Sequence, residues 1–352
     1  MKKNWLVLLI VALLTSVVLV ACGSSDDSNS STEENDTDNE AQETNEEEEA
    51  TESGESFVIG ATQIVEHPSL DAAYEGFQAA INDAGLDVEF VFQTANGEQS
   101  NASTIANNFV ADEVDLIFAN STPSAQSALQ ATSDIPILFT SVTDAVDAGL
   151  VESMDQAGNN ITGVLDMHPD AVQQTVDFID QYFEGATVGF VYNAGEPNSV
   201  NQVNTVKEAI EGTSLSTTEA TVGNSSEVNQ STTSLVGDAD VFYIVTDNTV
   251  VSALESVISV AEEQSIPLIV AEPDSVKRGG FAAYGFEYYD IGYRTGEMAV
   301  SILKGEKSVA DIAPEYPGEI DLYINKEAAE AQGIDWQDAW DEANVVETSA
   351  AE

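Results

Sequence analysis

Short runs of apolar and β-branched residues alternate along this chain with longer stretches in which apolar residues recur every three or four positions. The run at 57–60 is typical of a buried strand, and the stretch at 70–84 is typical of a helix that stops at Gly85. Predicted strands are 57–60, 88–92, 115–119, 136–139, 187–192, 216–221, 241–245 and 267–270. Predicted helices are 70–84, 102–110, one that begins near Pro123, 171–183, 200–211, 227–236 and 250–264.

This alternation restarts after Gly163, so the chain carries two successive series of β and α units. Alternating units favour parallel sheets that are covered by helices and joined by right-handed crossovers. About 295 residues follow the first strand's start, which is too many for one simple core. The sequence therefore predicts an α/β protein with two Rossmann-like lobes, parallel sheets and a ligand cleft between the lobes.

Polar side chains gather in five loops that directly follow predicted strands. In open α/β sheets, ligands bind outside the carboxyl ends of the strands, where each loop leads into a helix N-terminus. The candidate ligand-binding residues in these loops are Gln63, His67, Thr122, Ser124, Gln126, Ser141, Asp144, Glu196, Asn198, Ser199, Asp247 and Asn248.

Each candidate also has a purely structural interpretation, because Ser, Thr, Asn and Asp at such positions cap helices. A helix N-terminus that faces a cleft is suited to a carboxylate, and the Thr122–Gln126 turn is our first choice for that role. Asp247, and after it Glu196, is then available to pair with an ammonium group. Walls for an aromatic side chain could come from aromatic residues that more often belong to cores. These residues are Phe139, Tyr192, Tyr284 and Phe286.

Motifs that support catalysis are missing from the sequence. No G-x-G-x-x-G follows the first strand, and neither G-x-x-x-x-G-K-[ST] nor G-x-S-x-G occurs. His67 and His168 are the only histidines, and they have no cysteine partners nearby, which argues against a zinc site. The sequence therefore predicts a binding protein that is not an enzyme and that uses no metal and no cofactor.

The first residues are typical of a secretory signal. Two lysines precede an apolar stretch at 5–20 that is too short to span a membrane comfortably. The stretch ends in Leu19-Val20-Ala21-Cys22-Gly23, which resembles the bacterial lipobox, and Cys22 is the only cysteine in the chain. This resemblance implies that 1–21 is a lipoprotein signal peptide and that the thiol of Cys22 becomes acylated.

Between Cys22 and Ser56 the composition changes to Ser, Thr, Asn, Asp and Glu, without Lys, Arg or aromatic residues. Such a segment buries too little apolar area to offset the entropy of ordering, so 22–56 is predicted to be a disordered acidic tether. The rest carries 7 basic and 49 acidic residues, a net charge of about −42. This charge excludes nucleic acid as a partner. Adaptation of the surface to a saline or alkaline exterior explains it better than a cation site.

Several segments match one known family in order along the chain. They are Gln63…His67-Pro68-Ser69-Leu70-Asp71, Thr122-Pro123-Ser124-Ala125-Gln126, Thr140-Ser141-Val142-Thr143-Asp144, Ile161-Thr162-Gly163-Val164, Tyr192-Asn193…Glu196-Pro197-Asn198-Ser199, Asp247-Asn248-Thr249-Val250 and Tyr284-Gly285…Tyr288-Tyr289-Asp290-Ile291-Gly292…Gly296-Glu297-Met298-Ala299. The chain resembles the ABC transporter substrate-binding family typified by tryptophan- and tyrosine-binding lipoproteins.

This resemblance implies a type I periplasmic-binding fold, in which three crossovers join two lobes that close on a ligand. It places 57–165 and about 286–310 in lobe 1, with a helix around 290–303. It places 166–285 and about 311–335 in lobe 2, with a returning strand near 320–324. We expect 336–352 to be an acidic C-terminal tail. The implied function is that of an extracellular, membrane-anchored monomer. It would capture a small molecule, with an aromatic amino acid favoured, and deliver it to an ABC permease and its ATPase.

Two other functions fit the same sequence. A binding site for a sugar or another small polar metabolite usually has more arginine contacts than this chain offers, since Arg278 and Arg294 are its only arginines. A sensor subunit that signals through a membrane receptor would use the same capture and closure. A neighbouring permease and ATPase reading frame would distinguish transport from sensing.

Overall fold

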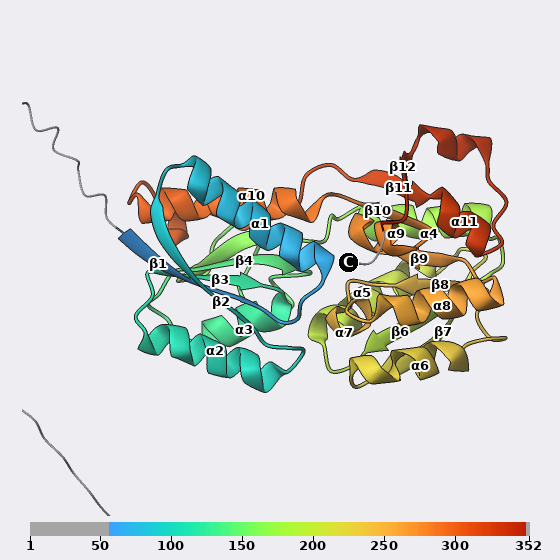
Figure 1. Ribbon diagram of the computed structural model, residues 1–352, viewed down its shortest axis with the longest axis horizontal. Helices are drawn as coiled ribbons and strands as arrows, with labels where there is room; N and C mark the ends of the chain where they lie inside the picture. Colours follow the sequence, from blue (N-terminus) through green and yellow to red (C-terminus); the bar gives the residue numbers. More distant parts are fainter. Residues whose placement is uncertain (1–55, 350–352) are drawn as a thin grey trace, which may run out of the picture. The chain divides into compact units, whose positions relative to one another are not determined.

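A computed structural model of the chain describes residues 56–349. This part contains two sheets made mostly of parallel strands, each covered by helices, which confirms the predicted α/β architecture with two lobes (Figure 1). The predicted signal peptide, Cys22 and nearly all of the predicted tether lie outside the described residues. Within 56–349, no helix combines the length and the apolar character that crossing a bilayer requires.

Lobe 1 is built on a five-stranded sheet in which all neighbouring strands run parallel. Its strands, in spatial order, are β2 (Asp87–Thr94), β1 (Ser56–Gln63), β3 (Leu116–Asn120), β4 (Ile137–Val142) and β5 (Ile161–Leu165). Its helices are α1 (Pro68–Asp83), α2 (Gln99–Ala111), α3 (Thr122–Ala131) and α10 (Tyr288–Leu303). Helices α2 and α3 bury one face of the sheet, and α1 and α10 bury the other. The central strands are therefore apolar and buried along their whole length.

Helix α10 comes from near the end of the chain and lies directly against α1 (Figure 1). Glycines allow the two backbones to touch: a Cβ at Gly76 would overlap the carbonyl oxygen of Tyr289, and one at Gly292 would overlap that of Ala73. The hydroxyl of Tyr293 also donates a hydrogen bond to Asp83 at 3.1 Å. This contact ties a late segment of the chain to the first lobe.

Lobe 2 is built on a seven-stranded sheet whose strands are parallel except for one antiparallel pair, β10 and β11. In spatial order the strands are β7 (Ser216–Val222), β6 (Thr187–Asn193), β8 (Val241–Ile244), β9 (Leu268–Val270), β10 (Ala282–Gly285), β11 (Asp321–Asn325) and β12 (Asn344–Val346). The helices are α4 (Ala171–Tyr182), α5 (Pro197–Ile210), α6 (Val228–Ser234), α7 (Asn248–Val251), α8 (Leu254–Gln264), α9 (Pro273–Arg278) and α11 (Lys326–Ala331).

The C-terminal segment is part of lobe 2, so the prediction of an acidic tail at 336–352 is wrong for most of its length. Trp340 is only 2% exposed and packs edge-on against Phe281, with ring centroids 5.2 Å apart. Strand β12 then extends the sheet beside β11. The acids of this segment stay at the surface, while Trp340 supplies the buried apolar area that fixes the segment in place.

Three segments cross between the lobes: one after β5, one before α10 and one after Glu315. The backbone of Glu315 pairs with lobe 1, since its N–H donates to the Gly163 carbonyl at 2.9 Å and its carbonyl accepts from Leu165 N–H at 2.8 Å. Lobe 1 therefore extends to Glu315, beyond the predicted boundary near 310.

Most predicted elements are recovered with shifted bounds, and two helices and one strand show the physical reasons or the size of the shift. The predicted helix 250–264 is two helices in the structure, because the helical conformation is interrupted at Ala253. The Asp247 side chain caps the first of them, α7, by accepting a hydrogen bond from Val250 N–H at 2.7 Å. The predicted helix 227–236 is the shorter α6, preceded by a 3₁₀ turn at Ser225–Glu227. Strand β4 runs on to Val142 instead of ending at Phe139.

Candidate ligand-binding site

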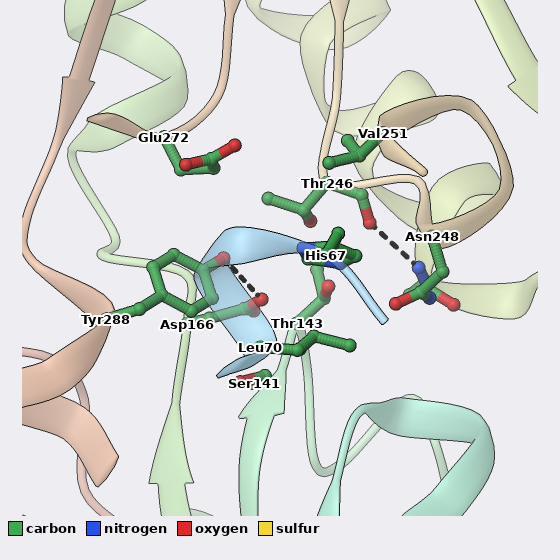
Figure 2. Close-up of a pocket in the computed structure, with 11 residues that line it drawn as sticks. His67, Leu70, Ser141, Thr143, Asp166, Thr246, Asn248, Val251, Glu272 and Tyr288 are labelled. Carbon is green, nitrogen blue, oxygen red and sulfur yellow. Dashed lines mark hydrogen bonds between the residues drawn. The ribbon is translucent and has the colours of Figure 1, made fainter. Parts of the chain in front are cut away.

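A small cavity lies between the lobes at the carboxyl ends of the strands, where the topology predicts a ligand site (Figure 2). Six strand ends contribute to it: those of β1 and β4 through β6, and those of β8 and β9. The residues that line it are His67, Leu70, Ser141, Thr143, Asp166, Asn198, Thr246, Asn248, Val251, Glu272 and Tyr288. Its volume is about 10 Å³, enough for about one water molecule. A larger ligand therefore requires the lobes or side chains to move.

Four polar atoms that line this cavity are buried and have no hydrogen-bond partner among the described residues. They are His67 Nδ1, Ser141 Oγ, Asp166 Oδ1 and Asn198 Oδ1. Leaving a buried polar atom without a partner costs about 1–3 kcal/mol, and native proteins contain few such atoms. Four of them converging from both lobes on one cavity indicate a site that a polar ligand completes.

The backbone is strained next to the cavity. Ser141 has φ of 55° and Ser121 has φ of 114°, although neither residue is glycine. Both lie at the ends of neighbouring strands, and the pairing of β4 with β5 shifts register between Phe139 and Val142. Such strain costs about 1–3 kcal/mol and is concentrated in proteins at binding sites, where it fixes the direction of a side chain. At Ser141 it accompanies a hydroxyl at the cavity wall.

Two carboxylates line the cavity. Asp166 accepts a hydrogen bond from the Tyr288 hydroxyl at 2.9 Å, a contact drawn in Figure 2. Burial raises the pKa of Asp166 to about 6, and the Tyr288 hydroxyl, the backbone and the nearby Thr143 hydroxyl offset part of the rise. Glu272 caps α9 by accepting from Ser275 N–H with both carboxylate oxygens at 3.0 Å. Burial and the nearby Asp274 raise its pKa as well.

No described lysine or arginine lines the cavity, and its one imidazole is uncharged. Burial, and to a smaller extent the positive charge of Arg278, lowers the pKa of His67 to about 3. His67 sits before the first turn of α1 and is 9% exposed. As a neutral ring it offers a ligand one donor or one acceptor, and no charge.

Glu196 and Asp247 are buried beside the cavity, and their contacts give them a structural role. Asp247 accepts from Asn193 N–H at 2.6 Å and from Val250 N–H at 2.7 Å, so each of its oxygens is engaged by the backbone. Glu196 accepts from the backbone and side chain of both Asn248 and Thr249 at 2.6–3.2 Å. Burial, and then the charge of Glu196, raises the pKa of Asp247 to about 7. These contacts show that Asp247 has a structural role, and its pairing with an ammonium group stays a prediction.

The other candidates from the sequence divide into two groups. Four of them, His67, Ser141, Asn198 and Asn248, line the cavity. The rest do not line the cavity and make hydrogen bonds within their own lobe. These pairs are Gln63 with Asp71 and Asn120, Thr122 with Thr143 N–H, Ser124 with Ser121, Gln126 with the Ala148 carbonyl, Asp144 with Val146 and Asp147 N–H, and Ser199 with Asn198. The start of α3, expected to hold a carboxylate, is capped by Ser121.

Comparison with known proteins agrees with this geometry. The family model described as ABC transporter substrate binding protein matches residues 58–344. This chain belongs to that family. Proteins of this family bind a small-molecule substrate outside the cytoplasm and work with a permease and an ATPase.

Relatives of this substrate-binding protein include a tyrosine-binding protein of Clostridioides difficile (strain R20291), 39% identical over 94% of this chain and 92% of the relative. An ABC domain from Streptococcus pneumonia, solved in complex with L-Trp, is 31% identical with a TM-score of 0.78. The ligand-free, open structure of a substrate binding protein with adhesive properties from Clostridium difficile is 39% identical with a TM-score of 0.62. Each of the two structures covers 83% of this chain and is itself covered completely. These matches confirm the type I periplasmic-binding fold.

The substrate-binding protein has cavity residues that sequence reasoning did not select. None of the four aromatic residues suggested as walls lines the cavity; Tyr288 does, stacked on Phe286 with ring centroids 5.6 Å apart. Asp166, Thr246 and Glu272 were also not selected. Each of these three lies within two residues of the end of a strand, so the rule that ligands bind at strand ends could have found them, whereas Tyr288 carries no such signal.

Proposed function

We propose that this protein is the lipid-anchored extracellular receptor of an ABC importer, and that it captures an amino acid, with an aromatic one favoured, by closure of its lobes. The observation that carries the proposal is the set of four unpartnered buried polar atoms around one cavity, supplied by both lobes and the first crossover. A ligand that completes such a site stabilises the closed arrangement of the lobes over the open one.

The lobe arrangement supports capture by closure. Helix α1 of lobe 1 contacts α9 of lobe 2, and the cavity between the lobes is smaller than an amino acid. The chain is more similar in structure to the L-Trp complex than to the open, ligand-free protein, although its sequence identity to the open protein is higher. This similarity to the ligand-bound relative supports capture by closure of the lobes.

The chemistry of the cavity favours an amino acid over a sugar. It combines carboxylates with neutral hydroxyl, amide and imidazole groups, so it can satisfy an ammonium group and hydrogen-bond a carboxylate. The aromatic preference rests on the two relatives whose names state tyrosine binding and an L-Trp complex. Nothing in the cavity suggests catalysis, and we propose that the protein is a monomer without enzymatic activity.

Attachment to the outer face of the cell membrane would occur through Cys22, the only cysteine of the chain. We expect metabolic labelling with a radioactive fatty acid to label the full-length protein and to leave Cys22→Ala unlabelled, because acylation needs the thiol. Ligand affinity of the released Cys22→Ala protein should equal that of the parent, since the site lies within residues 56–349. Labelling of the variant would contradict the anchor.

Ligand identity is tested by a thermal-shift screen, because a ligand that binds only the folded state raises Tm. We expect L-tyrosine, L-tryptophan or both to raise Tm, with a smaller rise for aliphatic amino acids and none for glucose or myo-inositol. At a ligand concentration one hundred times Kd, the stabilisation is about 2.7 kcal/mol. A rise with sugars and none with any amino acid would overturn the proposed ligand class.

A further inference from the structure

Asp166 differs from the other buried acids around the cavity in that its Oδ1 makes no well-formed hydrogen bond, although the Thr143 hydroxyl lies close enough to lower its pKa. It follows β5 directly, and its backbone N–H donates to the Val142 carbonyl at 3.0 Å, which fixes its position. Its Oδ2 accepts the Tyr288 hydroxyl at 2.9 Å, and its Oδ1 is buried without a partner. Glu272, Glu196 and Asp247 all use both oxygens to accept hydrogen bonds from their own lobe.

The charges around Asp166 leave it without a counterion. The titratable groups that line the cavity with it are His67 from α1, Glu272 from the turn before α9 and Tyr288 from α10, and none is positively charged at neutral pH. A buried carboxylate is costly unless it is paired, so the charge that would compensate Asp166 must come with the ligand.

We propose that Asp166 binds the ammonium group of the ligand through Oδ1, while Tyr288 holds Oδ2, so that the site selects ligands that carry a primary amine. This inference rests on the proposed function and specifies which group binds the amino end of the substrate. Tyr288 is a positioning residue in this arrangement. Both residues lie at crossovers between the lobes, so the amine is recognised at the hinge.

The test compares Asp166→Asn with the parent, using L-tyrosine and L-tryptophan and their des-amino acids, 3-(4-hydroxyphenyl)propanoate and indole-3-propanoate, as calorimetric titrants. The parent should prefer each amino acid over its des-amino analogue by roughly one hundredfold or more, because the analogue leaves the carboxylate unpaired. Asp166→Asn should lose this preference by weakening the binding of the amino acids. Asp112→Asn, which changes an exposed acid at the end of α2 away from the cavity, should keep it.

Two further measurements separate ligand recognition from a structural role. Asp166→Asn without ligand should be at least as stable as the parent, because it removes a buried charge; a structural role requires it to be less stable. In the parent, the affinity for L-tyrosine should fall up to tenfold per pH unit below about pH 6, where Asp166 must lose a proton to bind the amine. In Asp166→Asn this dependence should be flat.

The outcomes distinguish the inference from the function on which it rests. If the parent binds amino acids and des-amino acids equally well, or if Asp166→Asn keeps the preference, the role of Asp166 is overturned while amino-acid capture stands. If the parent binds none of the amino acids, the proposed ligand class fails, and the inference fails with it. An intermediate loss of preference in Tyr288→Phe, about tenfold, would support the positioning role of the hydroxyl.

Discussion

Glu196→Ala is expected to lower the free energy of unfolding by about 3 kcal/mol and to weaken ligand binding at least tenfold. Glu196 is 8% exposed, and its carboxylate accepts four hydrogen bonds from Asn248 and Thr249. Hydrogen bonds to a charged group contribute about 1.5–3 kcal/mol each, and relief of the repulsion with Asp247 returns only part of that sum. The binding loss follows because Asn248 lines the cavity and is held there by Glu196.

Urea unfolding and calorimetry on the same protein preparations check this expectation. Glu208→Ala is the matched control, since Glu208 is an exposed acid on α5, the helix that Glu196 precedes. That variant should stay within about 0.5 kcal/mol of the parent. If Glu196→Ala unfolds at the same urea concentration as Glu208→Ala, the carboxylate does not hold the start of α7, and the structural role assigned to it is wrong.

Asp247→Asn is expected to change how stability depends on pH, and to have a smaller effect on ligand affinity. Burial and the charge of Glu196 raise the pKa of Asp247 from 3.8 to about 7 in the folded protein. Between these two pH values the unfolded chain loses the proton and the folded protein retains it, so stability falls as pH rises, by about 1.4 kcal/mol per pH unit. Above about pH 7 both states are ionised and the loss is complete.

The measurement is the difference in unfolding free energy between Asp247→Asn and the parent from pH 4 to pH 8. We expect this difference to move in favour of the variant by about 3–4 kcal/mol between pH 4 and pH 7, and then to stay constant. Taking the difference removes the contribution of the other acids, including Asp166. Asp238→Asn, an exposed acid in the same lobe, should show no such trend. If the difference in unfolding free energy between Asp247→Asn and the parent does not change with pH, then Asp247 and Glu196 do not retain a proton between them in the folded protein.

The hydrophobic pattern of the sequence was sufficient to predict the architecture. Buried parallel strands appear in the sequence as short apolar runs, because each strand is covered on both faces. The helices between them appear as stretches with periodic apolar residues, because each helix buries only one face. Rules of topology then place the carboxyl ends of these strands at one edge, which is why polar residues in those loops reach the cavity. His67, Ser141, Asn198 and Asn248 were found in this way.

Only the tertiary structure decided which polar groups remain available to a ligand. Helix caps and ligand sites use the same residue types, so the sequence does not distinguish Asp247, whose oxygens accept backbone N–H groups, from Asp166, which keeps one oxygen unpartnered. The partner that orients Asp166 is Tyr288, 122 residues away in the chain, and such contacts leave no local pattern. The same reason applies to Trp340, whose burial depends on aromatic partners in distant elements and overrides the acidic composition of its segment.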